Sequence, residues 1–170
     1  AAKVINSGKY KLWTPAEVED AQCYAVDVPT GGEVIFEVYG NKANSYDAYR
    51  EGLSPMCGPN GYGDAGASTD LKNLYEASDV RGTLFQEKDG VLWTAKYIGK
   101  GIATPDLTNT IIIRLSEMYL NRAEAILNGA SVSGTTAMAD LNALRANRGL
   151  EPLTSCGFGD VKLERRLELA

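Results

Sequence analysis

Residues 114–129 read RLSEMYLNRAEAILNG, and this stretch decides the fold. On an α-helix, where successive residues are about 100° apart, its apolar side chains form one stripe made of Leu115, Tyr119, Ala123, Ile126 and Leu127. The polar side chains gather on the opposite side, at Arg114, Glu117, Asn121, Glu124 and Asn128. Gly129 follows where a helix commonly ends in a left-handed residue. The stretch therefore predicts an amphipathic helix that packs on the rest of the protein.

Arg122 lies at the edge of the predicted apolar stripe, where Ser116 also interrupts it. One interpretation lays the aliphatic stem of Arg122 along the core and leaves its guanidinium group in water. The other buries the guanidinium group in an ion pair with a carboxylate, which requires good hydrogen-bond geometry. The sequence leaves both interpretations open.

A second helix follows within residues 135–148. Thr135 or Thr136 can cap its start, and Asp140 lies near its positive end. Gly149 can end it. Together the two helices, residues 114–148, come close to the roughly 34-residue period of a tetratricopeptide-like helical hairpin. One such pair cannot bury both of its faces, so we expect it to be a scaffold that packs against neighbours.

Shorter elements are expected along the rest of the chain. In chain order they are a helix tail over residues 1–5, a helix from Thr14 to residue 22, a strand over 33–39, a helix over 68–77, an extended segment over 111–113 and a last helix from Asp160. Asp89 and Gly90 separate two strand-like segments, which predicts a small β-hairpin. Because side chains alternate along a strand, Trp93 and Tyr97 are expected to share one face of it.

The composition is that of an ordinary globular domain, with 44% hydrophobic and 23% charged residues among 170. No linker divides the chain, so we expect a single domain over residues 1–170. The net charge of −5 and the pI near 4.8 argue against a nucleic-acid partner, because phosphate contacts need clustered cations. No apolar run approaches the roughly 20 residues that a membrane-spanning helix needs.

The sequence contains no histidine. This excludes Ser-His and Cys-His nucleophile pairs and removes the commonest general base and metal ligand. Cys23, Cys57 and Cys156 lack the spacing of metal ligands, so we interpret them as isolated thiols, with a disulfide between two of them left open. We therefore expect no metal and no cofactor.

Carboxylates are the remaining catalytic possibility, because two of them can hydrolyse a glycosidic bond. Glu33, Asp64 and Asp70 lie near loops, but the sequence does not fix their separation. Glu117 and Glu124 share a helix face, where solvation or pairing with another helix explains them better. We expect no catalytic residue.

The loop-rich region, residues 40–110, contains a long, polar and glycine-rich stretch over residues 40–69. Loops of this length within a compact domain are usually functional or mobile. A GxGxxG pattern occurs at residues 61–66, but Pro55 and Pro59 precede it where a nucleotide-binding fold needs a buried strand. The pattern therefore indicates a glycine-rich loop and not a nucleotide site.

Six side chains of this stretch have the chemistry that a sugar requires. An aromatic ring offers a flat apolar surface to the C–H face of a sugar, while Asn and Arg hydrogen-bond its hydroxyl groups. The candidate glycan-binding residues are Tyr46, Tyr49, Tyr62, Asn44, Arg50 and Asn60. The alternative is that one or two of these tyrosines only anchor the loop to the helices.

Three segments carry a resemblance to a known family: IIIRLSEMYLNRAEAILNG at residues 111–129, TTAMADLNALRANRGL at 135–150 and LERRLELA at 163–170. They resemble the signature of the SusD/RagB-like family of outer-membrane glycan-binding lipoproteins. The matching positions are Arg114, Leu115, Glu117, Tyr119, Leu120, Ala123, Glu124, Ala125, Asn142, Arg145, Arg148, Gly149, Leu150, Glu164, Arg165, Arg166, Glu168 and Leu169. Asp79 and Arg81 match a further Asp-x-Arg landmark; taken without the resemblance, they read as a surface pair at a turn.

The resemblance and the periodicity together predict a mainly α fold, with tetratricopeptide-like helical hairpins, long irregular loops and a small β-hairpin. The resemblance also implies non-catalytic binding of oligosaccharide or polysaccharide at the outer-membrane surface. The implied partner is a SusC-like TonB-dependent transporter, which receives the glycan. Two alternatives are a helical-repeat module that binds a protein and has no sugar site, and a carboxylate-based glycosidase.

Members of this family are considerably longer, so we expect the chain to be a fragment that lacks the lipid anchor. The last helix carries Leu163 and Leu167 as an apolar stripe and stops at Ala170. A short helix without packing is marginal in water. We therefore expect the amides of residues 160–170 to exchange faster than those of residues 114–128, unless another part of the chain covers them.

Overall fold

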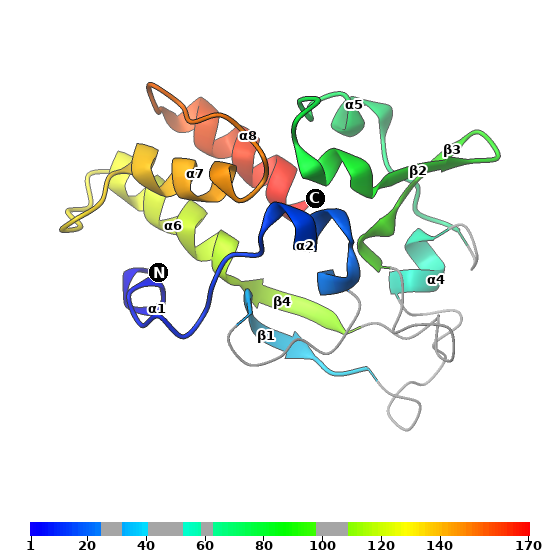
Figure 1. Cartoon of the computed structure of the whole chain (residues 1–170), viewed down its shortest axis with the longest axis horizontal. Coiled ribbons are helices and arrows are strands. Elements are labelled where there is room, and N and C mark those ends of the chain that lie inside the picture. The colour runs from blue at the N-terminus through cyan, green and yellow to red at the C-terminus, as the bar shows by residue number, and fades with distance from the viewer. Residues whose placement is uncertain (25–31, 41–52, 59–62, 98–108) are drawn as a thin grey trace.

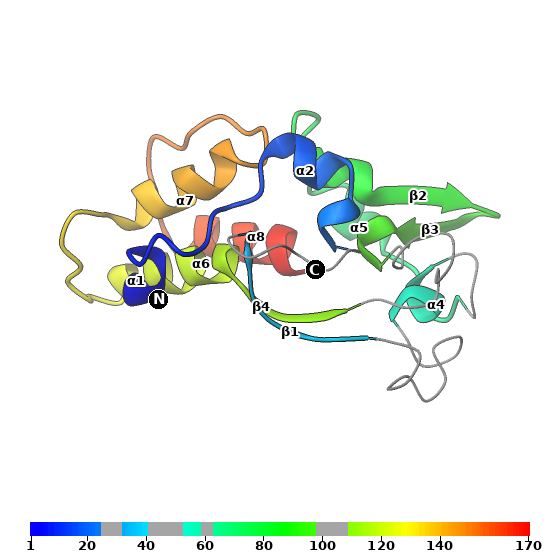
Figure 2. The ribbon, with the colours of Figure 1, turned by 60° about the horizontal axis from the view of Figure 1, so that its bottom comes forward.

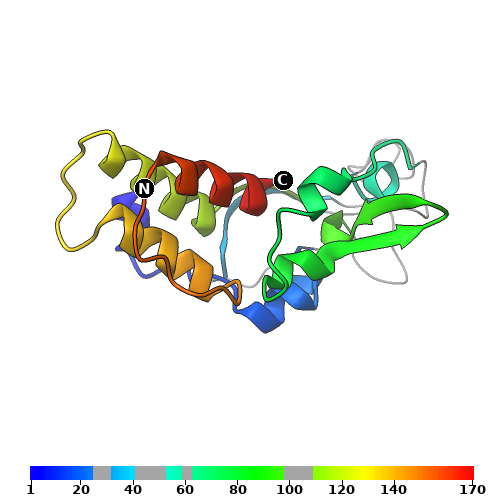
Figure 3. The ribbon, with the colours of Figure 1, turned by 90° about the horizontal axis from the view of Figure 1, so that it is seen from above.

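The helical hairpin predicted from residues 114–148 is present, as α6 (Leu115–Leu127) and α7 (Ala137–Ala146), in a computed structural model of the chain. A third helix, α8 (Phe158–Leu169), packs against α6, and the three helices lie together at one end of the molecule (Figures 1 and 3). The structure describes residues 1–24, 32–40, 53–58, 63–97 and 109–170. The mainly helical fold class predicted from the sequence is confirmed.

Small and branched side chains fill the space between these three helices. Ala123 of α6, Ala137 and Leu141 of α7 and Val161 of α8 are buried in one cluster. The alanines allow the helix backbones to approach, and burying a leucine-sized side chain contributes about 2 kcal/mol. This cluster holds the helical hairpin against α8.

The helix ends carry the caps that the sequence predicts. Gly129 has a φ of +91°, and the N–H of Ala130 bonds back to the carbonyl of Ala125 at 2.9 Å. Thr136 caps α7, because its hydroxyl oxygen accepts a hydrogen bond from the N–H of Ala139 at 3.1 Å. These local bonds fix where each helix begins and ends.

Two strands that are distant in the sequence pair below the helices. They are β1 (Val34–Val38) and β4 (Thr110–Arg114), which run antiparallel and lie side by side in Figures 1 and 2. The sequence predicted both extended segments but not their pairing. The chain passes directly from β4 into α6, and the N–H of Leu115 bonds to the carbonyl of Glu33 at 2.8 Å. The sheet thus brings Glu33 next to Arg114 at the start of α6.

A second core lies under four short helical segments: α2 (Pro15–Glu19), η1 (Gln22–Tyr24), η2 (Val80–Leu84) and η3 (Ala95–Tyr97). Its buried side chains include Trp13 and Tyr24, whose rings meet edge to face with centroids 4.9 Å apart. The α2 helix is shorter than expected, because Ala21 has a φ of +59° and interrupts it before residue 22. This interruption starts the tight turn that carries Tyr24 into the core.

The predicted β-hairpin is present as β2 (Phe85–Lys88) and β3 (Val91–Thr94). Asp89 and Gly90 both have positive φ, as a two-residue turn of this kind requires. The expectation that Trp93 and Tyr97 share a face of one strand is wrong. The strand ends at Thr94 and Tyr97 belongs to η3, so the alternation of a strand does not reach it.

Three further short helices complete the described chain: α1 (Ala2–Ile5), α4 (Leu53–Cys57) and α5 (Thr69–Lys72). Ser68 caps α5 as predicted, but α5 ends well before residue 77. The N–H groups of Leu74 and Tyr75 reach carbonyls only three residues back, so the helix closes in a tight turn. Within the described residues, no helix is both long enough and apolar enough to cross a bilayer.

The last helix, α8, is covered by α6 along one side. Val161 and Leu167 are buried, whereas Leu163 is 44% exposed, so the apolar stripe expected from Leu163 and Leu167 is only half correct. Fast amide exchange was expected only if no other part of the chain covered this helix. Because α6 packs against α8, we no longer expect the amides of residues 160–170 to exchange faster than those of residues 114–128.

We predict that Gly149→Ala will lower the free energy of unfolding by about 2–4 kcal/mol. Gly149 has a φ of +78°, and a Cβ atom there would lie 2.6 Å from the carbonyl oxygen of Ser78. Gly129→Ala is the matched control, because Gly129 also has positive φ, but a Cβ atom there would meet no described atom within 4 Å. The control should lose only about 1–2 kcal/mol. Urea unfolding measures both losses. If the two variants lose the same free energy of unfolding, the close contact between the new Cβ atom and Ser78 does not destabilise the protein.

Candidate functional site

The six candidate glycan-binding residues, Tyr46, Tyr49, Tyr62, Asn44, Arg50 and Asn60, all lie outside the described residues. Their assignment therefore stays a prediction. The described residues instead contain two features that bear on function: a network of buried charges and a cavity beside it.

The charge network centres on Glu168 of α8, which is 1% exposed. Arg148, which follows α7, donates to both carboxylate oxygens of Glu168, at 3.0 and 2.8 Å. Arg81 of η2 donates to the same carboxylate at 2.9 Å, and Arg114 of β4 donates both to it and to the main-chain oxygen of Glu168. Three segments of the chain are thus tied to one side chain.

Glu33 is the second shared carboxylate of the network and is fully buried. It accepts hydrogen bonds from Arg114 at 2.9 Å, from Arg148 at 3.1 Å and from the main-chain N–H of Trp13 at 2.9 Å. A carboxylate with all these partners and no contact with solvent cannot reach a substrate. Glu33 is therefore removed from the possible catalytic carboxylates considered from the sequence.

Asp79 and Arg81 are not the surface pair that the turn alone suggested. They are 3% and 1% exposed, and the two guanidinium nitrogens Nε and Nη2 of Arg81 bond to the carboxylate of Asp79 at 2.9 and 2.6 Å. Arg81 also reaches Glu164 of α8 at 2.7 Å. No local pattern indicates this burial, because the partners of Arg81 on α8 are more than 80 residues away.

Of the two interpretations of Arg122, the buried ion pair is the correct one. It is 7% exposed and forms two parallel hydrogen bonds with Asp140 of α7, at 2.8 and 2.7 Å. The hydroxyl of Thr135 donates to the same carboxylate at 2.9 Å. The hydrogen bonds with Asp140 raise the pKa of Arg122. The ion pair joins the two helices of the hairpin.

The acidity of Glu168 follows from its surroundings. Burial on its own would raise the pKa of the carboxyl group, but the positive charges of Arg114 and Arg148 outweigh it and hold the pKa well below the usual range. Glu168 is therefore ionised in the folded protein.

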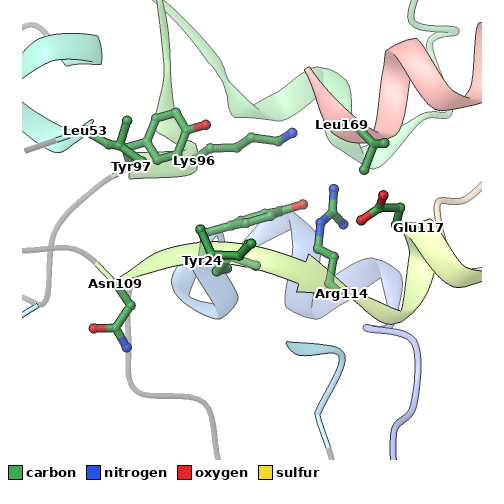
Figure 4. A pocket seen from close by; sticks show the side chains of 10 residues that line it. Tyr24, Leu53, Lys96, Tyr97, Asn109, Arg114, Glu117 and Leu169 are labelled. Carbon is green, nitrogen blue, oxygen red and sulfur yellow. The ribbon is translucent and has the colours of Figure 1, made fainter. Parts of the chain in front are cut away.

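A cavity of about 240 Å³ lies beside this network, between β4, η1, η3 and the end of α8 (Figure 4). Its lining residues are Tyr24, Leu53, Lys96, Tyr97, Asn109, Ile111, Ile112, Arg114, Glu117 and Leu169. Two tyrosine rings and several apolar side chains thus line the same space as an amide, a carboxylate and two cations. This combination suits a ligand with both apolar faces and polar groups.

A second cavity of about 200 Å³ shares the lining residues Lys96 and Tyr97 with the first. Its walls are mainly apolar, with Leu84 and Phe85 among them. It offers few groups that could orient a polar ligand, so the first cavity is the stronger candidate for a binding site.

The described residues carry neither a metal-binding cluster nor an activated thiol. Among them, no cluster of histidine, cysteine, aspartate and glutamate could hold a metal ion. Cys23, Cys57 and Cys156 are free thiols, as the sequence led us to expect, and burial raises the pKa of each. A thiol with a raised pKa is a poor nucleophile at neutral pH.

The family model of the SusD family matches residues 86–170, so the chain belongs to this family. A solved structure from Bacteroides vulgatus, assigned as a sugar-binding protein, is 26% identical, with a TM-score of 0.81 over 99% of this chain and 38% of its own. A SusD superfamily protein from Bacteroides thetaiotaomicron is 27% identical, with a TM-score of 0.75 over 96% of this chain and 40% of its own.

A third solved structure has the same fold at 20% identity, with a TM-score of 0.71 over 98% of this chain and 45% of its own. It is surface glycan-binding protein A from Bacteroides thetaiotaomicron, in complex with laminarihexaose. The chain thus spans less than half the length of these three relatives. Among curated proteins, none matches it significantly.

The family positions matched in the sequence now have a physical role. Arg114, Arg148, Glu164 and Glu168 all belong to the buried network, and Arg165 pairs with Glu124 across α8 and α6 at 2.9 Å. Sequence reasoning missed the cavity residues Tyr24 and Lys96. Both lie in 3₁₀ turns, which are too short to show burial as a periodic pattern.

We predict that Glu168→Gln will lower the free energy of unfolding by about 3–5 kcal/mol, because it leaves buried arginines without their shared carboxylate. Glu124→Gln is the control and should cost less than about 1 kcal/mol, since it breaks an exposed pair.

The pKa of Glu168 is lower in the folded than in the unfolded state. The stabilisation that the Glu168 carboxylate gives to the folded protein is therefore complete above the pKa of this group in the unfolded chain. It is lost as the pH falls through the pKa of the group in the folded protein.

Urea unfolding at neutral pH and through the acid range measures both effects. The gap between wild type and Glu168→Gln should narrow as the pH falls. A gap that stays constant into strong acid would show that the charge of Glu168 does not carry its stabilising role.

Proposed function

We propose that the full-length protein binds oligosaccharide or polysaccharide at the surface of the outer membrane. The observation that carries this proposal is membership of the SusD family, combined with a fold shared over 99% of the chain with a protein assigned as sugar-binding. The complex of another protein of this fold with laminarihexaose adds support from the fold alone.

Two parts of the chain are candidates for sugar contact. The first is the loop with Tyr46, Tyr49 and Tyr62, which has the side-chain chemistry for stacking on sugar rings. The second is the 240 Å³ cavity, where Tyr97 supplies an aromatic wall and Asn109 an amide. An oligosaccharide presents several rings, so the two contacts are compatible.

We propose further that the bound glycan is delivered to a SusC-like TonB-dependent transporter, and that the mature protein is a surface-exposed lipoprotein. Both follow from the resemblance of the chain to its family. In this role the helical hairpin and the charge network act as a rigid support. A support of this kind keeps loop side chains in place, so that less conformational entropy is lost when a ligand binds.

A protein-interaction module without a sugar site is the second candidate. It is favoured by exposed apolar side chains on the sheet, since Phe36, Val38 and Ile112 are 53%, 55% and 48% exposed. A glycan array distinguishes the two functions, because only the first predicts binding that depends on aromatic side chains.

We predict that the protein will not hydrolyse the glycans it binds. Glu33 is fully engaged with arginines, and no histidine is available as a general acid or base. Incubation with a bound oligosaccharide, followed by chromatography of the products, tests this. Product formation that disappears in Asp64→Asn or Asp70→Asn would establish a carboxylate-based glycosidase.

We predict that Tyr46→Ala, Tyr49→Ala or Tyr62→Ala will weaken glycan binding. Surface capture of a polymer does not need tight sites, so we expect a Kd near the millimolar scale, about −4 kcal/mol, for a short oligosaccharide. Loss of one stacking contact worth about 1.4 kcal/mol weakens binding about tenfold. We expect stability to change by less than about 0.5 kcal/mol, which is usual for substitutions outside a core.

Titration calorimetry with laminarihexaose, and with the other ligands that an array identifies, measures these affinities alongside melting curves. Tyr39→Ala is the control, because Tyr39 is an exposed tyrosine outside residues 44–62. Unchanged affinity in all three loop variants would remove the loop from the site. Melting losses of many degrees would show that its tyrosines belong to the core.

A further inference from the structure

The hydroxyl group of Tyr24 is buried and has no hydrogen-bond partner among the described residues. The side chain is 7% exposed, and its ring is fixed against Trp13. A buried hydroxyl without a partner costs about 1–3 kcal/mol. Figure 4 shows this hydroxyl pointing into the cavity, toward the ends of Lys96 and Arg114. The cavity therefore contains an unused hydrogen-bonding group that a ligand can satisfy.

Lys96 differs from the arginines of the buried network. Arg81, Arg114 and Arg148 each pair with at least one buried carboxylate. The ammonium group of Lys96 contacts the main-chain oxygens of Glu168 and Ala170, and no carboxylate side chain pairs with it in the described part of the chain. A buried cation of this kind lacks the partner that normally offsets its desolvation.

The electrostatics around Lys96 favour an anion. Burial, followed by the positive charge of Arg114, lowers the pKa of Lys96 to about 7, and Arg81 and Arg148 act in the same direction. Glu168 opposes them but does not restore the ordinary value. Three arginines thus surround the ammonium group, even though the whole chain has a net charge of −5.

The same cavity has walls that suit a sugar ring. Tyr97 and Ile111 give it apolar surface, and Asn109 and Glu117 give it polar groups. A neutral sugar hydroxyl could satisfy Tyr24, but it brings no negative charge to stabilise the protonated form of Lys96. A carboxylate satisfies both, because it accepts from a hydroxyl and from an ammonium group at once.

We propose that this cavity binds the carboxylate of an acidic sugar residue, a uronic acid, through the hydroxyl of Tyr24 and the ammonium group of Lys96. Arg114, at the wall of the same cavity, adds positive charge. This inference rests on the proposed glycan-binding function and narrows its substrate class to acidic glycans.

The test compares three probes on the full-length protein by titration calorimetry: glucuronate, glucose and acetate. Glucuronate should bind at least about tenfold more tightly than glucose, because only it supplies the counter-charge. It should also bind more tightly than acetate, which has no ring to contact the walls. Equal affinity for glucuronate and glucose would overturn the proposal, and equal affinity for glucuronate and acetate would overturn its sugar component.

Variants locate the site. Lys96→Met should abolish the preference for glucuronate over glucose, and Tyr24→Phe should weaken glucuronate binding several-fold. Lys96→Gln keeps donors for the main-chain oxygens but not the charge, so it serves if Lys96→Met does not fold. Lys72→Met is the matched control, since Lys72 also donates to a main-chain oxygen, at 2.6 Å, but lines neither cavity. A preference that survives in folded Lys96→Gln would overturn the proposal.

The proposed function and this inference fail in different ways. Binding of neutral oligosaccharides without any preference for uronates would leave the glycan-binding function standing and overturn the acidic specificity. Absence of binding to every sugar on the array and to glucuronate would overturn both.

Discussion

One carboxylate, that of Glu168, fixes the arrangement of the molecule. Guanidinium groups from η2, from β4 and from the end of α7 meet on it, and none of these segments is a sequence neighbour of another. Replacing such an ion cluster with apolar side chains is often neutral for stability, whereas removing one member is costly. The network therefore acts mainly as a specificity device: each segment has one position at which all charges are paired.

The parts of the fold that were predicted correctly depend on neighbouring residues. Periodicity located α6 and α7, Gly129 and Thr136 marked helix ends, and Asp89 with Gly90 marked the hairpin turn. The errors about charged residues and strand pairing came from contacts across the chain. Neither the burial of Arg81 nor the pairing of β1 with β4 leaves a local pattern, and the Asp-x-Arg motif that suggested a surface pair is part of the buried charge network. A resemblance to a family indicated which charged positions mattered, but not that they would meet.

Of the two candidate sites, one could be proposed from the sequence and the other only from the structure. The loop tyrosines were chosen by chemistry, since aromatic rings beside Asn and Arg suit a sugar, and that choice needs no three-dimensional information. The cavity could not be found in this manner. Tyr24 and Lys96 are 72 residues apart in a chain that shows no periodic signal at either, and only the folded core brings them to one space.

The sequence separations within the charge network also affect how the protein folds. The ion pair between Arg122 and Asp140 spans 18 residues, so the helical hairpin can close through a short loop. Arg148 bonds to the carbonyl of Trp13 across 135 residues and to Glu33 across 115. Loop closure over such distances lowers the folding rate, because its entropy is lost before the contacts are gained. We therefore expect the hairpin to form early, and the pairing of the central charges to be a late step of folding.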